Sequence, residues 1–114
     1  FLFAAFRYPE IKGIFYEKGF ASYYHQMFEG RTCSNGDIFR HNGLSAAHKT
    51  LKFGTMLRIT NLKNDSVVIV RVNDRLPKKS KCCIDLTMRA AKQLNFVKAG
   101  ITPVRIEILK DYLP

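Results

Sequence analysis

The chain has 114 residues, of which 46% are hydrophobic, so it suits one compact domain and leaves little for a second. Glycine and proline occur at ordinary frequencies and no tract is of low complexity, which excludes an intrinsically disordered chain. No apolar run approaches the roughly 20 residues of a membrane-spanning helix, so no membrane span is expected. The net charge of +10 favours polyanionic partners: nucleic acid, an anionic membrane or an anionic cell-wall polymer.

The first part of the chain carries weak secondary-structure signals. Residues 1–18 mix aromatic and basic side chains without a clear period, and are expected to be an N-terminal arm or a secretory remnant. Residues 20–24 are rich in β-forming side chains and predict a short strand. A polar loop is expected over 29–37, and Ser45 is expected to cap a helical turn over 46–49.

The central part of the chain predicts a β-hairpin. Residues 56–60 alternate between apolar and polar side chains, as a half-buried strand does. Residues 66–72 form the longest apolar run, which we interpret as a strand buried on both faces. The polar residues 61–65 between them supply the turn.

The last part of the chain predicts two strands around a helix. Residues 83–86 form a short strand candidate, and residues 104–109 alternate again. Between them a helix is expected near 87–95, with Thr87 as its N-cap and an apolar stripe along one side. Residues 111–114 are left as a C-terminal tail.

Two segments resemble each other. Residues 52–59 and 98–106 each follow a helical turn and lead through a glycine into a strand that contains an apolar–Arg–Ile sequence. This similarity indicates two halves related by pseudo-symmetry; chance similarity is the alternative. Together, the short strands and single helix predict a small β-barrel over residues 19–110, because closure removes exposed strand edges.

Four ionisable residues stand at the ends of apolar segments, where no periodicity requires them: Asp37, His48, Asp74 and Asp85. Carboxylates are costly to bury unpaired, so a surface cleft is expected around them. Acids near an imidazole can perform general acid–base catalysis where their environments separate their pKa values. Structural alternatives remain open, with Asp74 as a turn residue and Asp85 as an acid that favours the helix start.

Four segments, in this order and spacing, closely resemble the rare lipoprotein A family of septal lytic transglycosylases: GFASYYHQMFEGRTCSNGDIF, LSAAHKTLKFGTMLRITNL, VVIVRVNDRLP and IDLTMRAAKQL. The resemblance implies a mainly β fold, a six-stranded double-psi β-barrel with one or two short α-helices, related to the expansin and barwin-like barrels. It also implies cleavage of the β-1,4 bond between N-acetylmuramic acid and N-acetylglucosamine in peptidoglycan strands without stem peptides. The product carries a 1,6-anhydro ring.

The resemblance also implies roles for particular residues. Asp74 matches the motif aspartate and is expected to be the acid–base residue, with His48 as an active-site histidine. Asp37 is expected to be the third catalytic residue; it stands where the family commonly has glutamate. Leu76 stands where the family has glycine. The remaining implied residues are Asp85, Asn73 and Arg75 as supporting groups, and Tyr24 and Lys49 as substrate-binding groups.

The expected partners are peptidoglycan glycan strands in the cell envelope, bound by a monomer without a cofactor or metal. A non-catalytic, expansin-like glycan-binding barrel is the alternative. Nucleic acid is not expected, because the strand arginines lack regularly interleaved aromatic residues. The cysteines, Cys33, Cys82 and Cys83, are either buried thiols or supply one bridge from Cys33.

Overall fold

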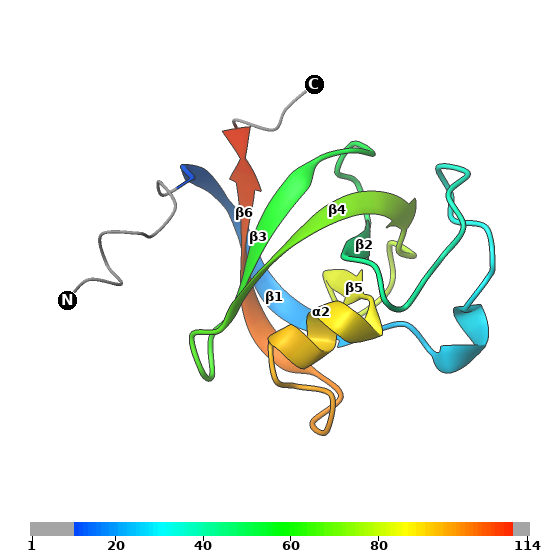
Figure 1. Ribbon diagram of the computed structural model, residues 1–114. Coiled ribbons are helices and arrows are strands. Elements are labelled where there is room, and N and C mark those ends of the chain that lie inside the picture. The colour runs from blue at the N-terminus through cyan, green and yellow to red at the C-terminus, as the bar shows by residue number, and fades with distance from the viewer. Residues whose placement is uncertain (1–10, 111–114) are drawn as a thin grey trace, which may run out of the picture.

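Six strands close into a barrel in the computed structural model, which describes residues 11–110 (Figure 1). Figure 1 shows helix α2 lying against the barrel near β5, and the long β1–β2 connection with η1 projecting on the right. In chain order the elements are β1 (Gly13–Tyr23), the 3-10 helix η1 (Gln26–Phe28), β2 (Ser45–His48), β3 (Met56–Asn61), β4 (Val67–Arg75), β5 (Ile84–Leu86), α2 (Met88–Gln93) and β6 (Thr102–Leu109).

The strand order around the barrel is β1-β5-β2-β4-β3-β6. The pairs β1–β5 and β2–β4 are parallel, and the other four pairs are antiparallel. This pattern is unchanged when β1, β2 and β3 are exchanged with β4, β5 and β6, which confirms the pseudo-symmetry expected from the internal similarity. Gly54 and Gly100, which precede β3 and β6, both adopt positive φ, at 91° and 80°.

Several predicted elements are confirmed. The central hairpin is β3 and β4, joined by residues 62–66. The helix is α2, and its N-cap is Thr87, whose hydroxyl accepts a hydrogen bond from the Ala90 N–H at 3.3 Å. The apolar stripe of this helix packs into the barrel, because Ala91 and Leu94 are fully buried with the core strands.

The helical turn predicted over residues 46–49 is wrong, because Ser45 opens strand β2 instead of capping a helix. Ala46 and Ala47 favour a helix locally, but β2 lies between β4 and β5 and hydrogen-bonds to both. Tertiary pairing therefore overrides local propensity. The small alanine side chains also suit a strand that is buried between two others.

Two strand predictions differ in detail. β4 is not buried on both faces, because Val68, Val70 and Val72 point into the core while Val67 and Arg71 are exposed. A barrel strand has only one inward face. β1 begins at residue 13, earlier than predicted, and the added residues pair with β6. The expected arm or secretory remnant otherwise falls on residues 1–10, which lie outside the described part.

A buried asparagine joins three elements at one end of the barrel. Asn61, at the end of β3, donates from Nδ2 to the carbonyl of Leu94 at 2.7 Å. Its Oδ1 accepts from the Thr102 hydroxyl at 2.8 Å and from the Lys63 N–H at 2.9 Å. This one side chain therefore links the hairpin turn, the end of α2 and the start of β6.

We expect Asn61→Ala to lower the free energy of unfolding by about 2–3 kcal/mol, because it leaves the buried Leu94 carbonyl and Thr102 hydroxyl without this partner. Urea denaturation followed by circular dichroism measures the change. Lys63→Ala is the control, since that side chain is exposed and its backbone N–H is retained. Equal stabilities of the two variants would show that the Asn61 contacts contribute nothing.

Candidate functional site

A groove of about 460 Å³ opens where β4, β2, β5 and the end of β1 meet. Asp74, Ala47, Asp85 and Ser22 stand side by side in these four strands, because Ala47 pairs in register with both aspartates and Asp85 pairs with Ser22. Register partners share a face of the sheet. At about 4.8 Å per strand, the two aspartate Cα atoms are roughly 10 Å apart, with only a methyl group between them.

A β-bulge puts Asp74 on this face. Ala46 lies opposite Val72 and Ala47 lies opposite Asp74, so Asn73 is an extra residue in β4. Strict alternation from the buried Val72 would point Asp74 into the core. The extra residue turns it to the groove instead, which is the usual effect of a bulge beside a functional site.

Four hydrogen bonds hold the Asp74 carboxylate. Its Oδ2 accepts from the Tyr24 hydroxyl at 2.6 Å. Its Oδ1 accepts from the Ser34 N–H at 2.8 Å, the Ser34 hydroxyl at 2.6 Å and the Arg75 N–H at 2.9 Å. Burial raises the pKa of Asp74, but these hydrogen bonds outweigh burial and hold the pKa below its usual value. Asp74 is therefore ionised at neutral pH.

Asp85 has the opposite character. Burial is the largest influence and raises the pKa of Asp85, and the nearby charge of Asp74 raises it further. A hydrogen bond from the Ser22 hydroxyl to Oδ1 acts in the other direction without reversing the shift. The groove thus holds two carboxyl groups of which one, Asp85, retains its proton to higher pH.

Tyr24 lines the groove but is only 7% exposed. Its ring packs against Phe39 with the ring centroids 4.2 Å apart, and its hydroxyl donates to Asp74. Burial and the neighbouring Asp74 both raise the pKa of Tyr24, so the hydroxyl remains a donor. A ring covered in this way presents little surface to a sugar.

Leu76 belongs to a small cluster of buried apolar side chains beneath the groove. The other members are Tyr24, Cys33, Phe39 and Ala47. The resemblance placed a glycine at this position. Leu76 does not have positive φ, so glycine's conformational freedom is not required here. The leucine side chain is buried and adds apolar contact behind Asp74.

Asp37 does not lie in the groove with Asp74. It lines a separate hollow of about 400 Å³, where its Oδ2 accepts from Arg71 at 3.0 Å and from Asn73 at 3.3 Å. Asn35, then Asn73 and the charge of Arg71, hold the pKa of Asp37 below its usual value. The Asn35 N–H also donates to the Asn73 carbonyl at 3.2 Å, so the turn that carries Asp37 is docked on the bulge.

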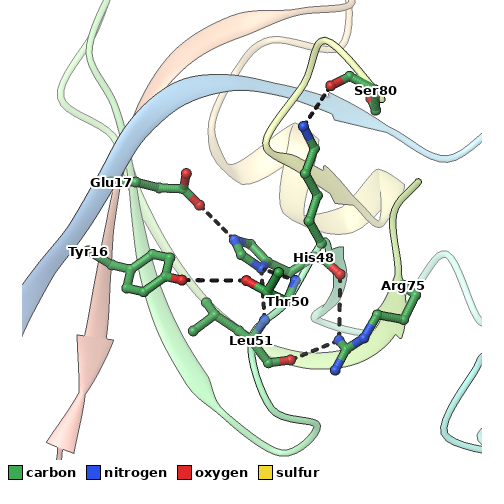
Figure 2. Close-up of polar contacts among 8 residues, drawn as sticks. Tyr16, Glu17, His48, Thr50, Leu51, Arg75 and Ser80 are labelled. Atoms are coloured by element: carbon green, nitrogen blue, oxygen red, sulfur yellow. Dashed lines mark hydrogen bonds and ion pairs between the residues drawn. The ribbon is translucent and has the colours of Figure 1, made fainter. Parts of the chain in front are cut away.

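His48 is buried and follows Ala47, the groove residue of β2, so the two side chains lie on opposite faces of the strand. Figure 2 shows the His48 ring directed toward Glu17 of β1. Its Nδ1 accepts from the N–H groups of Thr50 and Leu51, both at 3.1 Å. Nδ1 therefore carries no proton, and Nε2–H donates to Glu17 at 2.6 Å. Both ring nitrogens are thus occupied by protein groups, and the histidine holds the turn that follows β2.

That turn anchors Arg75, as Figure 2 shows. The Arg75 Nη1 donates to the Leu51 carbonyl at 2.8 Å and lies 3.5 Å from the His48 carbonyl, and the guanidinium stacks 4.1 Å from the Phe53 ring centroid. Lys49 is also committed to the protein, since its Nζ donates to the Ser80 carbonyl at 2.7 Å.

Several residues of the site had not been predicted. Ser34 and Ser22 hold the two carboxyl groups, and Glu17 holds His48. Phe28 and Arg31 line the groove from the β1–β2 connection. Serines in a polar loop and on a short strand carry no distinguishing pattern, so only the three-dimensional contacts reveal them.

Other features concern metals, membranes and thiols. Within residues 11–110, no group of three or more His, Cys, Asp or Glu is placed to hold a metal ion. None of the helices in the described ranges is long and apolar enough to cross a membrane. Cys33, Cys82 and Cys83 are free thiols, with Cys33 buried beneath the groove.

The chain is similar to known proteins of one family. A family model described as lytic transglycolase matches residues 16–106. The chain belongs to this family. The endolytic peptidoglycan transglycosylase RlpA of Campylobacter jejuni is 46% identical over 80% of this chain and 33% of its own length. The RlpA proteins of Haemophilus influenzae and Rickettsia prowazekii are 46% and 44% identical, over 82% and 90% of this chain.

This lytic transglycolase domain spans about a third of the length of these curated relatives. Solved structures show the fold. The Streptomyces papain inhibitor has a TM-score of 0.65 at 17% identity, covering 82% of this chain and 96% of that one. A Clavibacter michiganensis expansin, solved with cellohexaose, has a TM-score of 0.66 at 20% identity, covering 85% and 52%. The predicted double-psi β-barrel is confirmed.

We expect Tyr24→Phe to raise the pKa of Asp74, because it removes one of the four hydrogen bonds to the carboxylate. Carbon-13 NMR titration of the aspartate carboxyls measures this pKa. Because the folded-state pKa of Asp74 is depressed, its stabilising contribution is present above the unfolded-state pKa and is lost as pH falls through the folded-state pKa. The stability cost of Tyr24→Phe should therefore shrink on acidification.

The matched control is Tyr23→Phe, because the Tyr23 hydroxyl donates to the Val97 carbonyl instead of Asp74. It should leave the Asp74 titration unchanged. An unchanged Asp74 pKa in Tyr24→Phe would mean that the tyrosine does not support the ionised form.

Proposed function

We propose that this domain is a lytic transglycosylase that cleaves the bond between N-acetylmuramic acid and N-acetylglucosamine in peptidoglycan and leaves 1,6-anhydro ends. The names of the RlpA relatives support this reaction and polymer. The observation that carries the proposal is the pair of groove carboxyl groups, Asp74 and Asp85, whose pKa values are shifted in opposite directions. Such a pair is suited to supply an acid and a base together.

In the proposed mechanism Asp85 donates its proton to the glycosidic oxygen as the C1–O bond breaks. Ionised Asp74 stabilises the positive charge that develops at C1. The sugar's own 6-hydroxyl then attacks C1, its proton passes to Asp74, and no water is consumed. One proton has left Asp85 and one has reached Asp74, so proton transfer from Asp74 to Asp85 through solvent resets the site.

Asp74 also depends on its neighbours in this proposal. Hydrogen bonds from Tyr24 and Ser34 keep the Asp74 carboxylate ionised and fixed in orientation. Tyr24 therefore acts through its hydroxyl instead of stacking on a sugar. Asp37 and Asn73 are positioning residues, because they dock the turn that carries Ser34 onto the bulge. The family resemblance implied a catalytic role for Asp37, whereas in this proposal Asp37 does not contact the substrate.

His48 and Lys49 act from behind the groove in the same proposal. His48 holds the turn that anchors Arg75, next to Asp74 in the chain, and both of its ring nitrogens are already bonded to protein. Lys49 fixes the loop around Ser80. We assign both as positioning residues, without direct contact with substrate.

The proposed substrate places the domain in the cell envelope, where peptidoglycan lies. In this proposal the domain acts as a monomer, since Asp74 and Asp85 come from strands of the same barrel. The net charge of +10 favours association with an anionic wall polymer.

We expect the unmodified protein to release 1,6-anhydro products from purified sacculi, mainly after amidase has stripped the stem peptides. Asp74→Asn and Asp85→Asn should each reduce the rate by at least about 100-fold while glycan binding persists. Mass spectrometry of the digest and sacculus pelleting measure the two properties. Asp65→Asn, in the exposed β3–β4 turn, is the charge-matched control. Binding without products from the unmodified protein would favour the expansin-like, non-catalytic alternative.

The pH dependence should be bell-shaped. Activity rises with pH through the depressed pKa of Asp74, because that group must be ionised, and falls through the raised pKa of Asp85, because that group must be protonated. The steady-state rate on soluble stripped strands, measured across the acidic range, gives the profile. Tyr24→Phe should move only the acidic limb to higher pH. A shift confined to the alkaline limb would reverse the assigned roles.

A further inference from the structure

Two arginines, Arg31 and Arg75, line the groove, and they differ in their hydrogen-bond partners. Arg75 is anchored by Nη1 to the Leu51 carbonyl at 2.8 Å. Arg31 lies in the β1–β2 connection and is exposed. Within the described part of the chain, the Arg31 side chain has neither a hydrogen-bond acceptor nor an acidic partner, so its donors are available to a ligand.

The local fold places Arg31 at the groove without neutralising it. The Arg31 N–H donates to the Phe28 carbonyl at 3.0 Å, and Gly30 has a φ of 84°, so a tight turn folds Arg31 back on Phe28. The guanidinium carbon lies 5.1 Å from the centroid of the Phe28 ring. This cation–π contact holds the side chain in place without using its N–H groups.

The nearest acid in the sequence is used elsewhere. Glu29 receives a hydrogen bond from the His41 N–H at 2.8 Å and lies 3.4 Å from Arg40. The groove also contains the ionised Asp74 carboxylate, which repels anions. A substrate that carries its own carboxylate therefore needs a cation to offset this repulsion, and Arg31 is the groove cation whose donors are unoccupied.

We propose that Arg31 binds a carboxylate substituent of the glycan, namely the lactyl carboxylate of N-acetylmuramic acid. This inference rests on the proposed function. A glycan strand without stem peptides has one free lactyl carboxylate per disaccharide, whereas in a peptide-bearing strand that group is an amide. A guanidinium binds carboxylate through two parallel hydrogen bonds, so Arg31 makes the groove selective for stripped strands.

Equilibrium binding of fluorescently labelled glycan strands tests this, with the full chain carrying Asp85→Asn to prevent turnover. The probes are amidase-stripped strands, the same strands with their carboxylates converted to methylamides, peptide-bearing strands and chitin hexamer. The dissociation constant of the methylamide strands should exceed that of stripped strands roughly tenfold. Arg31→Gln should abolish this difference and leave chitin hexamer binding unchanged.

The control is Arg89→Gln, which makes the same charge change at an exposed arginine that lines a different hollow. It should retain the preference for stripped strands. If Arg31→Gln weakens chitin hexamer as much as stripped strands, or if the parent does not distinguish methylamides, the proposal is overturned. Equal effects of Arg31→Gln and Arg89→Gln would also overturn it, since net charge would then explain the binding.

The peptide-bearing strands separate the two sources of carboxylate. Arg31-dependent binding of these strands, without such binding of stripped strands, would assign the carboxylate to the stem peptide and overturn the lactyl assignment. Because binding is measured without turnover, this result is independent of catalysis. Arg31-dependent binding of stripped strands, together with no anhydro products from the chain that retains Asp85, would contradict the proposed reaction alone.

Discussion

The extra residue at Asn73 is the constraint on which the rest of the site depends. Without it, the alternation of β4 would direct Asp74 into the barrel core beside Val72, where an ionised carboxylate would be strongly destabilising. With it, Asp74 shares a face with Asp85. A bulge leaves a ladder position unpaired, so other contacts must hold it. Here the Asn35 N–H and the Asp37 side chain bind Asn73 from the neighbouring turn.

The difference between the two carboxyl groups follows from how each burial cost is met. Both are partly buried, which favours the neutral form. Asp74 receives four hydrogen bonds, whereas Asp85 receives one from Ser22 and feels the charge of Asp74. Ionising the first carboxyl therefore makes ionisation of the second harder. The two roles arise from one shared environment instead of from two independent sites.

Much of this fold could be predicted from the sequence, because alternation, a turn and a helix cap are local signals. The hairpin and α2 were predicted in this way. β2 was not, because its alanines favour a helix and only pairing on both sides makes it a strand. The site was predictable only in part. The position of Asp74 at the end of a strand can be recognised in the sequence. The bulge that directs its side chain to the groove cannot, because it does not change the pattern of apolar residues.

The positions of Asp37 and His48 show what a motif can and cannot specify. Both stand out in the sequence as ionisable residues without a structural requirement, yet neither shares the groove with Asp74 in this structure. Asp37 reaches Asp74 through a docked turn, and His48 acts through two backbone N–H groups of the next turn. An ionisable side chain that fixes a backbone is as sensitive to replacement as one that reacts. Necessity for activity alone therefore cannot separate positioning from catalysis, whereas the position of a pH limb can.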